Sequence, residues 1–219
     1  MNKKIDYQKH FQECIEKLKN EREKVLENKC LSLNGRIMLF EYFKFGTLSS
    51  NIPRFSLYIG LHGGGGCPKE VNDQQWSNHK HLYDKWLNSS SVGPCIWFVP
   101  RAPENLWNMW HVSYIDDMLD YVIQTFLVLE LIDVNRVYLS GYSAGGDGVY
   151  KLGPRMADRL AGAAMCGGHP NGASMLSLRN CFFSIQVGEH DDAYNRNGVA
   201  LEYSKQLENF KYFLKGNLN

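Results

Sequence analysis

Short apolar runs alternate with segments of helical periodicity along most of this chain, and this alternation constrains the fold more than any other feature. Five of these runs are short and mostly apolar, which favours buried strands. They are residues 55–61, 95–99, 136–140, 160–166 and 181–187. Strands that alternate with helices predict an α/β protein with a mostly parallel sheet covered by helices on both faces.

The remaining segments complete this prediction. Residues 36–45 alternate in part and are rich in aromatic residues, so they are a further predicted strand. The predicted helices are residues 3–28, 75–87, 114–130, 144–152 and 198–214. The first of them is charge-dense and carries one apolar stripe, which is typical of an amphipathic helix lying on a domain. No linker divides the chain, so we expect an N-terminal helix in residues 1–30 packed on one domain in residues 31–219.

Composition excludes several classes of protein. The chain has 219 residues, 44% of them hydrophobic, and a net charge of +1, which argues against a disordered tail and against nucleic acid or an anionic membrane as partner. No apolar run begins the sequence and none reaches 18 residues, so we expect a cytoplasmic protein without a spanning helix. The six cysteines form no C-x-x-C pair and no zinc-type cluster, so free thiols and no metal are expected.

The strongest chemical signal is the pattern Gly141-x-Ser143-x-Gly145. A predicted strand ends at Ser140 and a helix-compatible segment follows Ser143, which is the strand–turn–helix setting of a nucleophile elbow. Glycines are needed there because the serine sits on a tight, strained turn with no room for neighbouring side chains. The alternative is a Gly/Ser turn without chemistry.

The second signal is His62, which directly follows a predicted strand and is followed by four glycines. Glycines leave backbone N–H groups exposed, so they can point at a developing oxyanion. A phosphate-binding loop would need Gly-Lys-Ser/Thr, whereas this run continues Cys67-Pro68-Lys69. No acidic ribose partner of a dinucleotide site can be placed either. A merely flexible glycine loop remains the alternative, and His62 is expected to brace the loop and not to act as a base.

Together these motifs resemble those of the α/β-hydrolase esterases and lipases. Residues 62–65 are similar to the HGGG-type oxyanion motif of that superfamily, and residues 141–145 are similar to its nucleophile elbow. Further stretches resemble the poly-hydroxyalkanoate depolymerase and feruloyl-esterase-like branch, namely residues 61–66, 100–103, 168–171 and 188–191. The resemblance covers about residues 35–214 and implies an α/β-hydrolase-type three-layer sandwich.

The resemblance also implies roles for single residues. Ser143 would be the nucleophile, and the backbone N–H of Ala144 would form half of the oxyanion hole. The N–H groups of Gly64 and Gly65 would form the other half. Asp191 would be the acid that orients a histidine, with Asp192 as the close rival and Glu189 as the distant one.

Aromatic and histidine side chains are expected near the same edge of the sheet as the serine. Trp107, Trp110 and His111 follow the 95–99 strand, and His169 follows the 160–166 strand. We expect them to contact substrate, with tryptophan rings walling an acyl or aromatic pocket. Plain packing of the loop is the alternative for the tryptophans.

The sequence departs from the family at its end, because the last histidine, His190, precedes Asp191 and no histidine follows Asp191. The family order is serine, acid and histidine, with one more strand before the histidine. Three explanations remain open: a C-terminally truncated hydrolase, a degenerate relative that binds without turnover, or a substitute histidine among His169, His190 and His111. Truncation is favoured because the other motifs are intact, and the 181–187 strand would then lie at an exposed sheet edge.

The resemblance therefore implies a serine carboxylic-ester hydrolase that acts on a small-molecule ester through an acyl-enzyme, without cofactor or metal. Its activity is expected to be impaired, because loss of the histidine from such a triad costs about 10⁶ in turnover. A catalytically dead binding protein of the same fold is the first alternative, and a serine peptidase of the same fold is the second.

Overall fold

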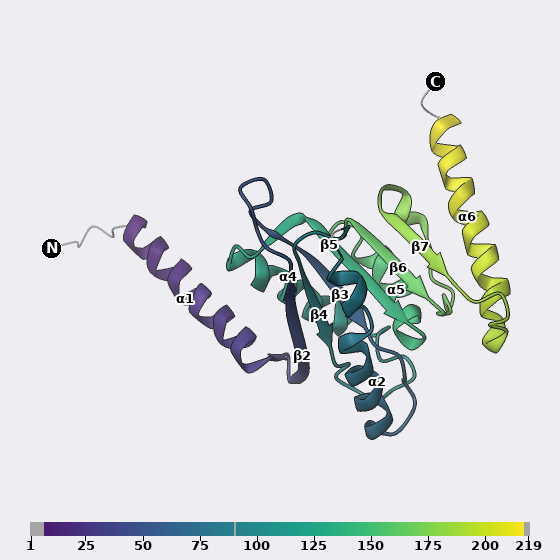
Figure 1. Cartoon of the computed structure of the whole chain (residues 1–219), viewed down its shortest axis with the longest axis horizontal. Helices are drawn as coiled ribbons and strands as arrows, with labels where there is room; N and C mark the ends of the chain where they lie inside the picture. Colours follow the sequence, from purple (N-terminus) through teal and green to yellow (C-terminus); the bar gives the residue numbers. More distant parts are fainter. Residues whose placement is uncertain (1–6, 90, 217–219) are drawn as a thin grey trace.

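The computed structural model describes residues 7–89 and 91–216. Seven strands form one sheet in the order β1-β2-β4-β3-β5-β6-β7 (Figure 1). The strands are β1 (Cys30–Leu33), β2 (Arg36–Phe45), β3 (Phe55–Leu61), β4 (Cys95–Pro100), β5 (Ile132–Tyr142), β6 (Gly162–Cys166) and β7 (Phe182–Gln186). The pairs β1–β2 and β2–β4 are antiparallel, and every other pair is parallel, as the alternation of strands and helices predicts.

Helices cover both faces of the sheet. They are α1 (Tyr7–Asn28), α2 (Lys69–His81), α3 (Asp84–Leu87), α4 (Tyr114–Val128), α5 (Ala144–Arg155) and α6 (Arg196–Gly216), with short 3₁₀ turns η1 (Leu176–Asn180) and η2 (Ala193–Asn195). One core joins α4 and α5 to strand residues such as Ile59 and Phe98. A second core joins α2 and α3 to Trp97 and Val99 on the opposite face. The predicted three-layer arrangement is therefore present.

Two elements differ from the sequence prediction. β1 is not among the predicted strands, although Asn34-Gly35 between β1 and β2 is a strong hairpin signal. The helix predicted over residues 75–87 begins earlier, at Lys69, and gives way to the separate short helix α3. Pro68 stands directly before Lys69 as the N-cap residue, where the backbone N–H that proline lacks has no role in the helix. The other predicted elements are present, with ends that differ by a few residues.

The carboxyl ends of three adjacent strands meet at one edge of the sheet. Leu61 of β3 pairs with Gly141 of β5, and Tyr142 of β5 pairs with Cys166 of β6. Parallel strands expose their carboxyl ends on the same side, and ligands of open α/β sheets bind outside these ends. The glycine-rich loop after β3 and the turn after β5 are thereby placed side by side.

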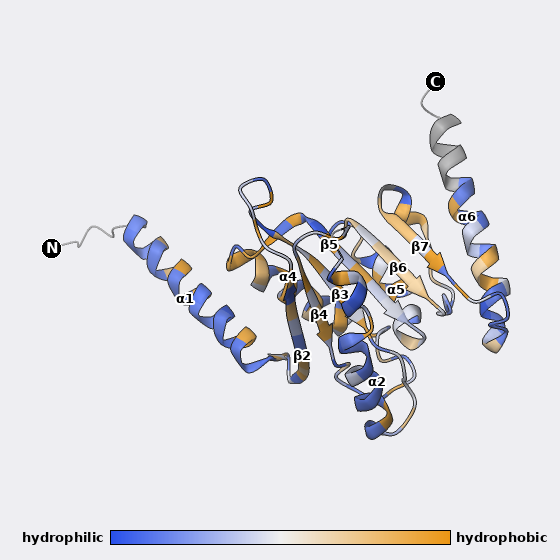
Figure 2. Ribbon diagram, in the orientation of Figure 1, coloured by the Kyte–Doolittle hydropathy of each residue, from blue (hydrophilic) through white to orange (hydrophobic). Residues whose placement is uncertain are grey.

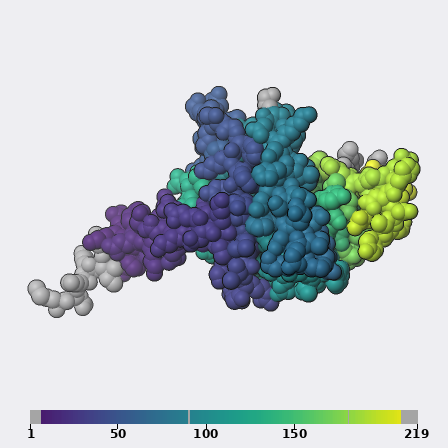
Figure 3. All heavy atoms as spheres, turned by 60° about the horizontal axis from the view of Figure 1, so that its bottom comes forward, coloured from purple at the N-terminus to yellow at the C-terminus, as the bar shows by residue number. Residues whose placement is uncertain are grey.

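The two terminal helices differ in how they contact the sheet domain. Helix α1 is largely hydrophilic and its outer part stands away from the body of the molecule (Figures 2 and 3). Its inner half is anchored on α4, where Nη1 of the buried Arg22 donates to Thr125 Oγ1 at 3.2 Å. Residues 3–6 of the predicted helix lie outside the described residues. The division into a 1–30 helix and a 31–219 domain stays a prediction.

At the other end of the sheet, β7 lies at the edge and pairs with β6. This is the edge position expected for the 181–187 strand. Helix α6 packs beside it, and the Tyr203 hydroxyl donates to the carbonyl of Ala173 at 3.1 Å. Across residues 7–89 and 91–216, no helix combines the length and the apolar character that crossing a bilayer requires.

Candidate active site

Ser143 occupies a strained turn between β5 and α5. Its φ is 55° and its ψ is −121°, a left-handed conformation that costs a non-glycine residue about 1–3 kcal/mol. Two backbone hydrogen bonds hold it there. The Ser143 N–H donates to the carbonyl of Cys166 at 2.9 Å, and the Ser143 carbonyl accepts from the N–H of Asp147 at 3.0 Å. The predicted strand–turn–helix setting is therefore found at this residue.

The flanking glycines are needed for close backbone approach. A Cβ on Gly145 would lie 2.0 Å from the carbonyl oxygen of Leu61, and one on Gly141 would lie 2.2 Å from the carbonyl oxygen of Gly145. Real Cβ atoms do not approach backbone oxygens so closely. The pattern of glycines around Ser143 thus lets the start of α5 press against the end of β3.

The glycine run after His62 passes directly beside the serine. A Cβ on Gly63 would lie 3.3 Å from Cβ of Ser143. Gly64 and Gly65 have φ of 105° and 78°, which glycine adopts without strain. The two segments that the sequence assigned to nucleophile and oxyanion binding are therefore adjacent in space.

A buried polar network holds this loop in place. The side chain of Asn72 is buried, and its Oδ1 accepts a 2.8 Å hydrogen bond from the Gly65 N–H. Its Nδ2 donates to the Cys67 carbonyl at 3.2 Å and to Asn105 Oδ1 at 3.1 Å. The Gly65 N–H, predicted as an oxyanion donor, thus already has an acceptor. Sequence reasoning did not identify Asn72, because a single asparagine in a polar helix gives no signal.

His62 braces the loop from below. Its ring is fully buried; Nδ1 lies 2.6 Å from the Gly63 carbonyl and Nε2 accepts from the Ala102 N–H at 3.1 Å. An Nε2 that accepts leaves the proton on Nδ1, which donates to Gly63. Burial lowers the pKa of His62 to about 3 from its usual 6.5. A neutral ring with both nitrogens engaged is a structural support for the loop, in agreement with the expectation for this residue.

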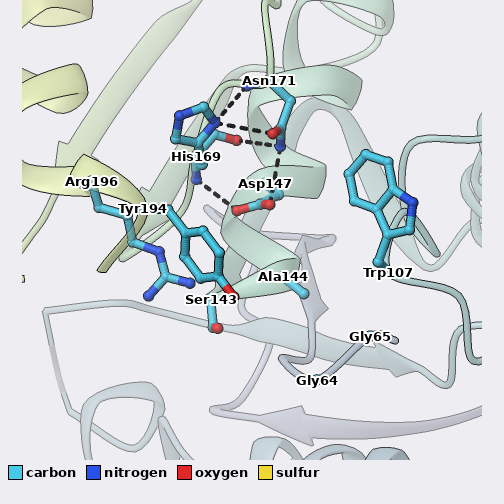
Figure 4. A pocket seen from close by; sticks show the side chains of 10 residues that line it. All are labelled: Gly64, Gly65, Trp107, Ser143, Ala144, Asp147, His169, Asn171, Tyr194 and Arg196. Carbon is cyan, nitrogen blue, oxygen red and sulfur yellow. Dashed lines mark hydrogen bonds between the residues drawn. The ribbon is translucent and has the colours of Figure 1, made fainter. Parts of the chain in front are cut away.

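A cavity of about 620 Å³ opens above Ser143. Figure 4 shows its walls, which come from the glycine loop, the loop after β4 that carries Trp107, the start of α5 and the segments after β6 and β7. Its lining residues are Gly64, Gly65, Trp107, Ser143, Ala144, Asp147, His169, Asn171, Tyr194 and Arg196. This is a volume in which a small organic ligand fits.

One wall is a hydrogen-bonded cluster of Asp147, His169 and Asn171. The Asp147 carboxylate accepts from the His169 N–H at 2.6 Å and from Asn171 Nδ2 at 3.0 Å. Nδ1 of His169 lies 3.0 Å from both the backbone nitrogen and Oδ1 of Asn171. In Figure 4 these side chains lie against one another, and the His169 ring is turned toward Asn171 and not toward the Ser143 hydroxyl.

The acid predicted after β7 is paired with an arginine. Oδ1 of Asp191 lies 3.6 Å from Nη1 of Arg196, which is the first residue of α6. The Asp191 N–H donates to the Gly188 carbonyl at 3.0 Å, so the carboxylate stands on a tight turn. Asp191 is partly buried, whereas its rivals Asp192 and Glu189 are exposed.

The four predicted substrate contacts fall in different places. Trp107 and His169 line the cavity. Trp110 does not, because it is 0% exposed and its Nε1 donates to the His62 carbonyl at 3.0 Å. His111 packs edge-on against the Trp107 ring at 5.4 Å and lies outside the cavity lining, and burial lowers its pKa.

The prediction for Trp110 and His111 as cavity walls is thus not supported by their positions. Sequence reasoning missed four lining residues: Asp147, Asn171, Tyr194 and Arg196. Asp147 has a detectable signal, since it follows Ser143 by one helical turn and shares its face. Within the described residues, no three His, Cys, Asp or Glu side chains gather as metal ligands would.

Comparisons with known proteins give one related sequence and several related structures. No protein-family model matches the chain. The chain is 28% identical over 151 residues to the bifunctional acetylxylan esterase/xylanase XynS20E of Neocallimastix patriciarum. This match covers 67% of the chain and 21% of the fungal protein, so the chain spans about a fifth of that relative's length.

The solved structures that share the architecture include an esterase, a ferulic acid esterase and a peptidase-like protein. A thermostable esterase matches with a TM-score of 0.60 and 18% identity, over 87% of this chain and 53% of its own. A ferulic acid esterase matches with a TM-score of 0.57 and 13% identity, over 82% of this chain and 84% of its own. A Bacteroides ovatus protein described as a dipeptidyl aminopeptidase IV matches with a TM-score of 0.57 and 13% identity, over 83% of this chain and 30% of its own. At these identities the matches establish a shared fold.

Proposed function

We propose that this chain, which has the α/β-hydrolase fold of the esterases it resembles, is a serine carboxylic-ester hydrolase whose nucleophile is Ser143. The observation that carries the proposal is the strained Ser143 turn beside the glycine loop, with a Cβ on Gly63 lying 3.3 Å from Cβ of Ser143. Strain at a non-glycine residue persists only where the surrounding structure enforces it, and it gathers at functional sites. The weak sequence relative, an acetylxylan esterase/xylanase, favours the same class of reaction.

The proposed reaction has two steps. Ser143 Oγ attacks the carbonyl carbon of a small-molecule ester, and the N–H groups of Ala144 and Gly64 face the oxyanion that forms. Ala144 is suited to this because the first N–H groups of a helix have no intrahelical acceptor. The alcohol then leaves with the serine proton, and water cleaves the acyl-enzyme to give the carboxylic acid and regenerate Ser143. Neither step calls for a cofactor or a metal.

The hydroxyl proton of Ser143 needs a base to accept it, and a base is the part of a catalytic triad that this site lacks among the described residues. The hydrogen bonds of Ser143 within the described residues are made by its backbone, and no histidine follows His190 in the 219 residues. A serine hydroxyl without a base is mostly protonated and weakly nucleophilic. We therefore propose that the site forms the acyl-enzyme slowly. A catalytic triad that lacks its histidine retains a rate about 10³-fold above that of the reaction in water.

One observation favours the alternative of a binding protein without turnover. The carboxylate proposed as the acid, Asp191, is paired with the Arg196 guanidinium at 3.6 Å instead of an imidazole. A guanidinium stays protonated at neutral pH, so it cannot accept the serine proton as an imidazole does. The cavity would still bind a ligand under this alternative.

Labelling with a fluorophosphonate probe tests the proposal, because such probes react with activated serines. Because Ser143 lacks a base within the described residues, we expect slow covalent labelling of the wild-type chain at Ser143, loss of labelling in Ser143→Ala, and labelling at the same slow rate in Ser140→Ala. Ser140 is the matched control, since it lies on β5 with its hydroxyl 3.4 Å from the Ile59 carbonyl. No labelling of folded wild-type protein would favour the binding protein. Faster cleavage of an aminoacyl p-nitroanilide than of p-nitrophenyl acetate would favour the peptidase alternative.

A further inference from the structure

Arg196 brings a partly unsatisfied positive charge to the cavity above Ser143. Its side chain lines the cavity and is 19% exposed. In Figure 4 the guanidinium extends from α6 past the Tyr194 ring toward Ser143. The contact with the Tyr194 ring is 5.4 Å from the guanidinium carbon to the ring centroid. The group is thus held in the lining of the same cavity as Ser143, with part of its surface exposed.

The hydrogen-bonding capacity of this guanidinium is largely unused. An arginine has five N–H donors in a planar fork that matches a carboxylate. Nε of Arg196 is buried and has no hydrogen-bond partner in the described part of the chain. Its ion pair with Asp191, at 3.6 Å, is longer than a hydrogen bond. Because Nε is closed to solvent, a ligand in the cavity would meet the guanidinium through its Nη groups, and a charge-assisted hydrogen bond there would add affinity.

Two carboxylates, Asp147 in the lining and Asp191 beside Arg196, compete with a bound anion for this charge. Asp147 is the other charged group in the lining, and its two oxygens already accept from the His169 N–H and from Asn171 Nδ2. Asp191 contacts Arg196 from the side and is outside the lining. An anion entering the cavity would therefore meet Arg196 and would have to share it with Asp191.

We propose that Arg196 is a specificity-determining residue that binds a free carboxylate on the substrate, so that the preferred esters are monoesters of dicarboxylic acids. This rests on the proposed ester hydrolysis at Ser143 and adds the substrate class. The free carboxylate pairs with the Arg196 fork while the ester carbonyl lies at Ser143. A neutral ester of the same length leaves the guanidinium with its long contact to Asp191 alone, which is the basis of the discrimination.

Calorimetric titration of the Ser143→Ala chain tests the binding without turnover. The probes are monomethyl succinate, which carries one carboxylate, and dimethyl succinate, its neutral counterpart. We expect the monoester to bind roughly tenfold more tightly than the diester, as charge-assisted hydrogen bonds allow. When Arg196→Gln is added to the Ser143→Ala chain, this preference should disappear. When Arg196→Lys is added instead, part of the preference should remain. Arg159→Gln, which removes an exposed arginine paired with Asp120, is the matched control and should keep the full preference.

A second variant moves the affinity in the opposite direction. In the same background, Asp191→Asn removes the competing carboxylate, and we expect tighter binding of monomethyl succinate with little change for dimethyl succinate. This variant keeps the proposal testable if Arg196→Gln does not fold. Acetate shows how much of the binding comes from a carboxylate alone. It carries no ester and should bind more weakly than monomethyl succinate.

The proposal is overturned if the monoester and the diester bind equally, or if the preference survives in Arg196→Gln. Weaker monoester binding in Asp191→Asn would also contradict it. The proposed function fails separately, through absence of fluorophosphonate labelling in the wild-type chain. A chain that prefers the monoester in calorimetry but is not labelled would be an anion-binding protein, and the role of Arg196 would stand without the hydrolase.

Discussion

The backbone N–H of Ser143 donates a 2.9 Å hydrogen bond to the carbonyl oxygen of Cys166, the last residue of β6. The strained turn after β5 is therefore tied to the end of the neighbouring parallel strand. Both atoms of this bond belong to the backbone. The left-handed conformation of Ser143 is therefore held by the sheet and not by a hydrogen bond from a nearby side chain. Changes that separate the turn from the strands around it should therefore be far more damaging than changes in the cavity walls.

Gly145→Ala should destabilise the chain although alanine is the better helix former. Helix propensity favours alanine by about 1 kcal/mol. The added Cβ would nevertheless lie 2.0 Å from the Leu61 carbonyl oxygen, so backbone would have to move. We expect the free energy of unfolding to fall by about 2 kcal/mol or more, as for other overpacked sites. Urea denaturation followed by tryptophan fluorescence measures this.

Gly188→Ala is the control for that substitution. The atom nearest to its added Cβ would be Cβ of Asp191 at 3.8 Å, an ordinary van der Waals contact. Its free energy of unfolding should stay within about 1 kcal/mol of the wild type. Equal effects of the two substitutions would show that α5 does not press on β3 as described.

Trp107→Ala and Trp110→Ala should separate ligand binding from stability. Trp110 is 0% exposed, so its loss should lower the free energy of unfolding by about 3–5 kcal/mol. Trp107 is 63% exposed at the cavity, so its loss should change stability by less than about 1 kcal/mol while weakening ligand binding. Urea denaturation and calorimetric titration of each variant check this pair. A large loss of stability in Trp107→Ala would argue that its ring is part of the core.

Two buried histidines should make the chain less stable in acid. Burial lowers the pKa of His62 to about 3 and that of His79 to about 4, both from 6.5. Between these values and pH 6.5 the unfolded chain binds protons that the folded chain does not, so stability rises with pH in this window. It is fully present above about pH 6.5 and is lost as the pH falls toward 4 and then 3.

His79→Leu tests this linkage, since Nε2 of His79 is buried without a hydrogen-bond partner in the described residues. Each such group contributes up to about 1.4 kcal/mol per pH unit to the slope of stability against pH. We expect the slope measured by urea denaturation between pH 6 and 4.5 to be smaller in the variant by about this amount. An unchanged slope would mean that His79 takes up its proton in the folded chain as readily as in the unfolded one.

Added imidazole should accelerate ester hydrolysis by the wild-type chain. Proton transfer by a positioned base contributes about 10²–10⁴ to such reactions, and a dissolved base recovers part of this if the cavity admits it. The rate with p-nitrophenyl acetate, corrected for the reaction of imidazole alone, should rise with imidazole concentration. Ser143→Ala should show no enzyme-dependent rise. The same stimulation in both chains would place the reaction elsewhere on the protein.

The strands and the Ser143 turn are predictable from sequence because each has a local cause. β3 and β4 are buried on both faces, so they appear as short continuous apolar runs. The glycines around Ser143 are required by backbone contacts within the same turn and to the adjacent strand. β1 has four residues, too few to establish a period, and its hairpin signal Asn34-Gly35 was the only local cue.

The cavity walls are less predictable because their positions depend on irregular loops. Trp107 and Trp110 are three residues apart in a turn-rich segment, and nothing in their spacing tells which ring faces the core. Arg196 follows Tyr194 and Asn195, which both have positive φ, 56° and 57°. Such conformations reverse the chain direction without a periodic signature, so the pairing of Arg196 with Asp191 is visible only in three dimensions.

The pairing of Leu61 with Gly141 fixes the chemical centre through a main-chain ladder. The proposed nucleophile Ser143 and the glycine loop proposed to bind the oxyanion follow these two neighbouring strands, so the distance between them is set by the spacing of the strands. Side chains around the cavity can then be exchanged one at a time without shifting the reacting groups. If the proposed reaction holds, a protein built this way can change which ligand it accepts while keeping the position of Ser143, and substitutions at Trp107 or Arg196 in the cavity lining are the places where such divergence would begin.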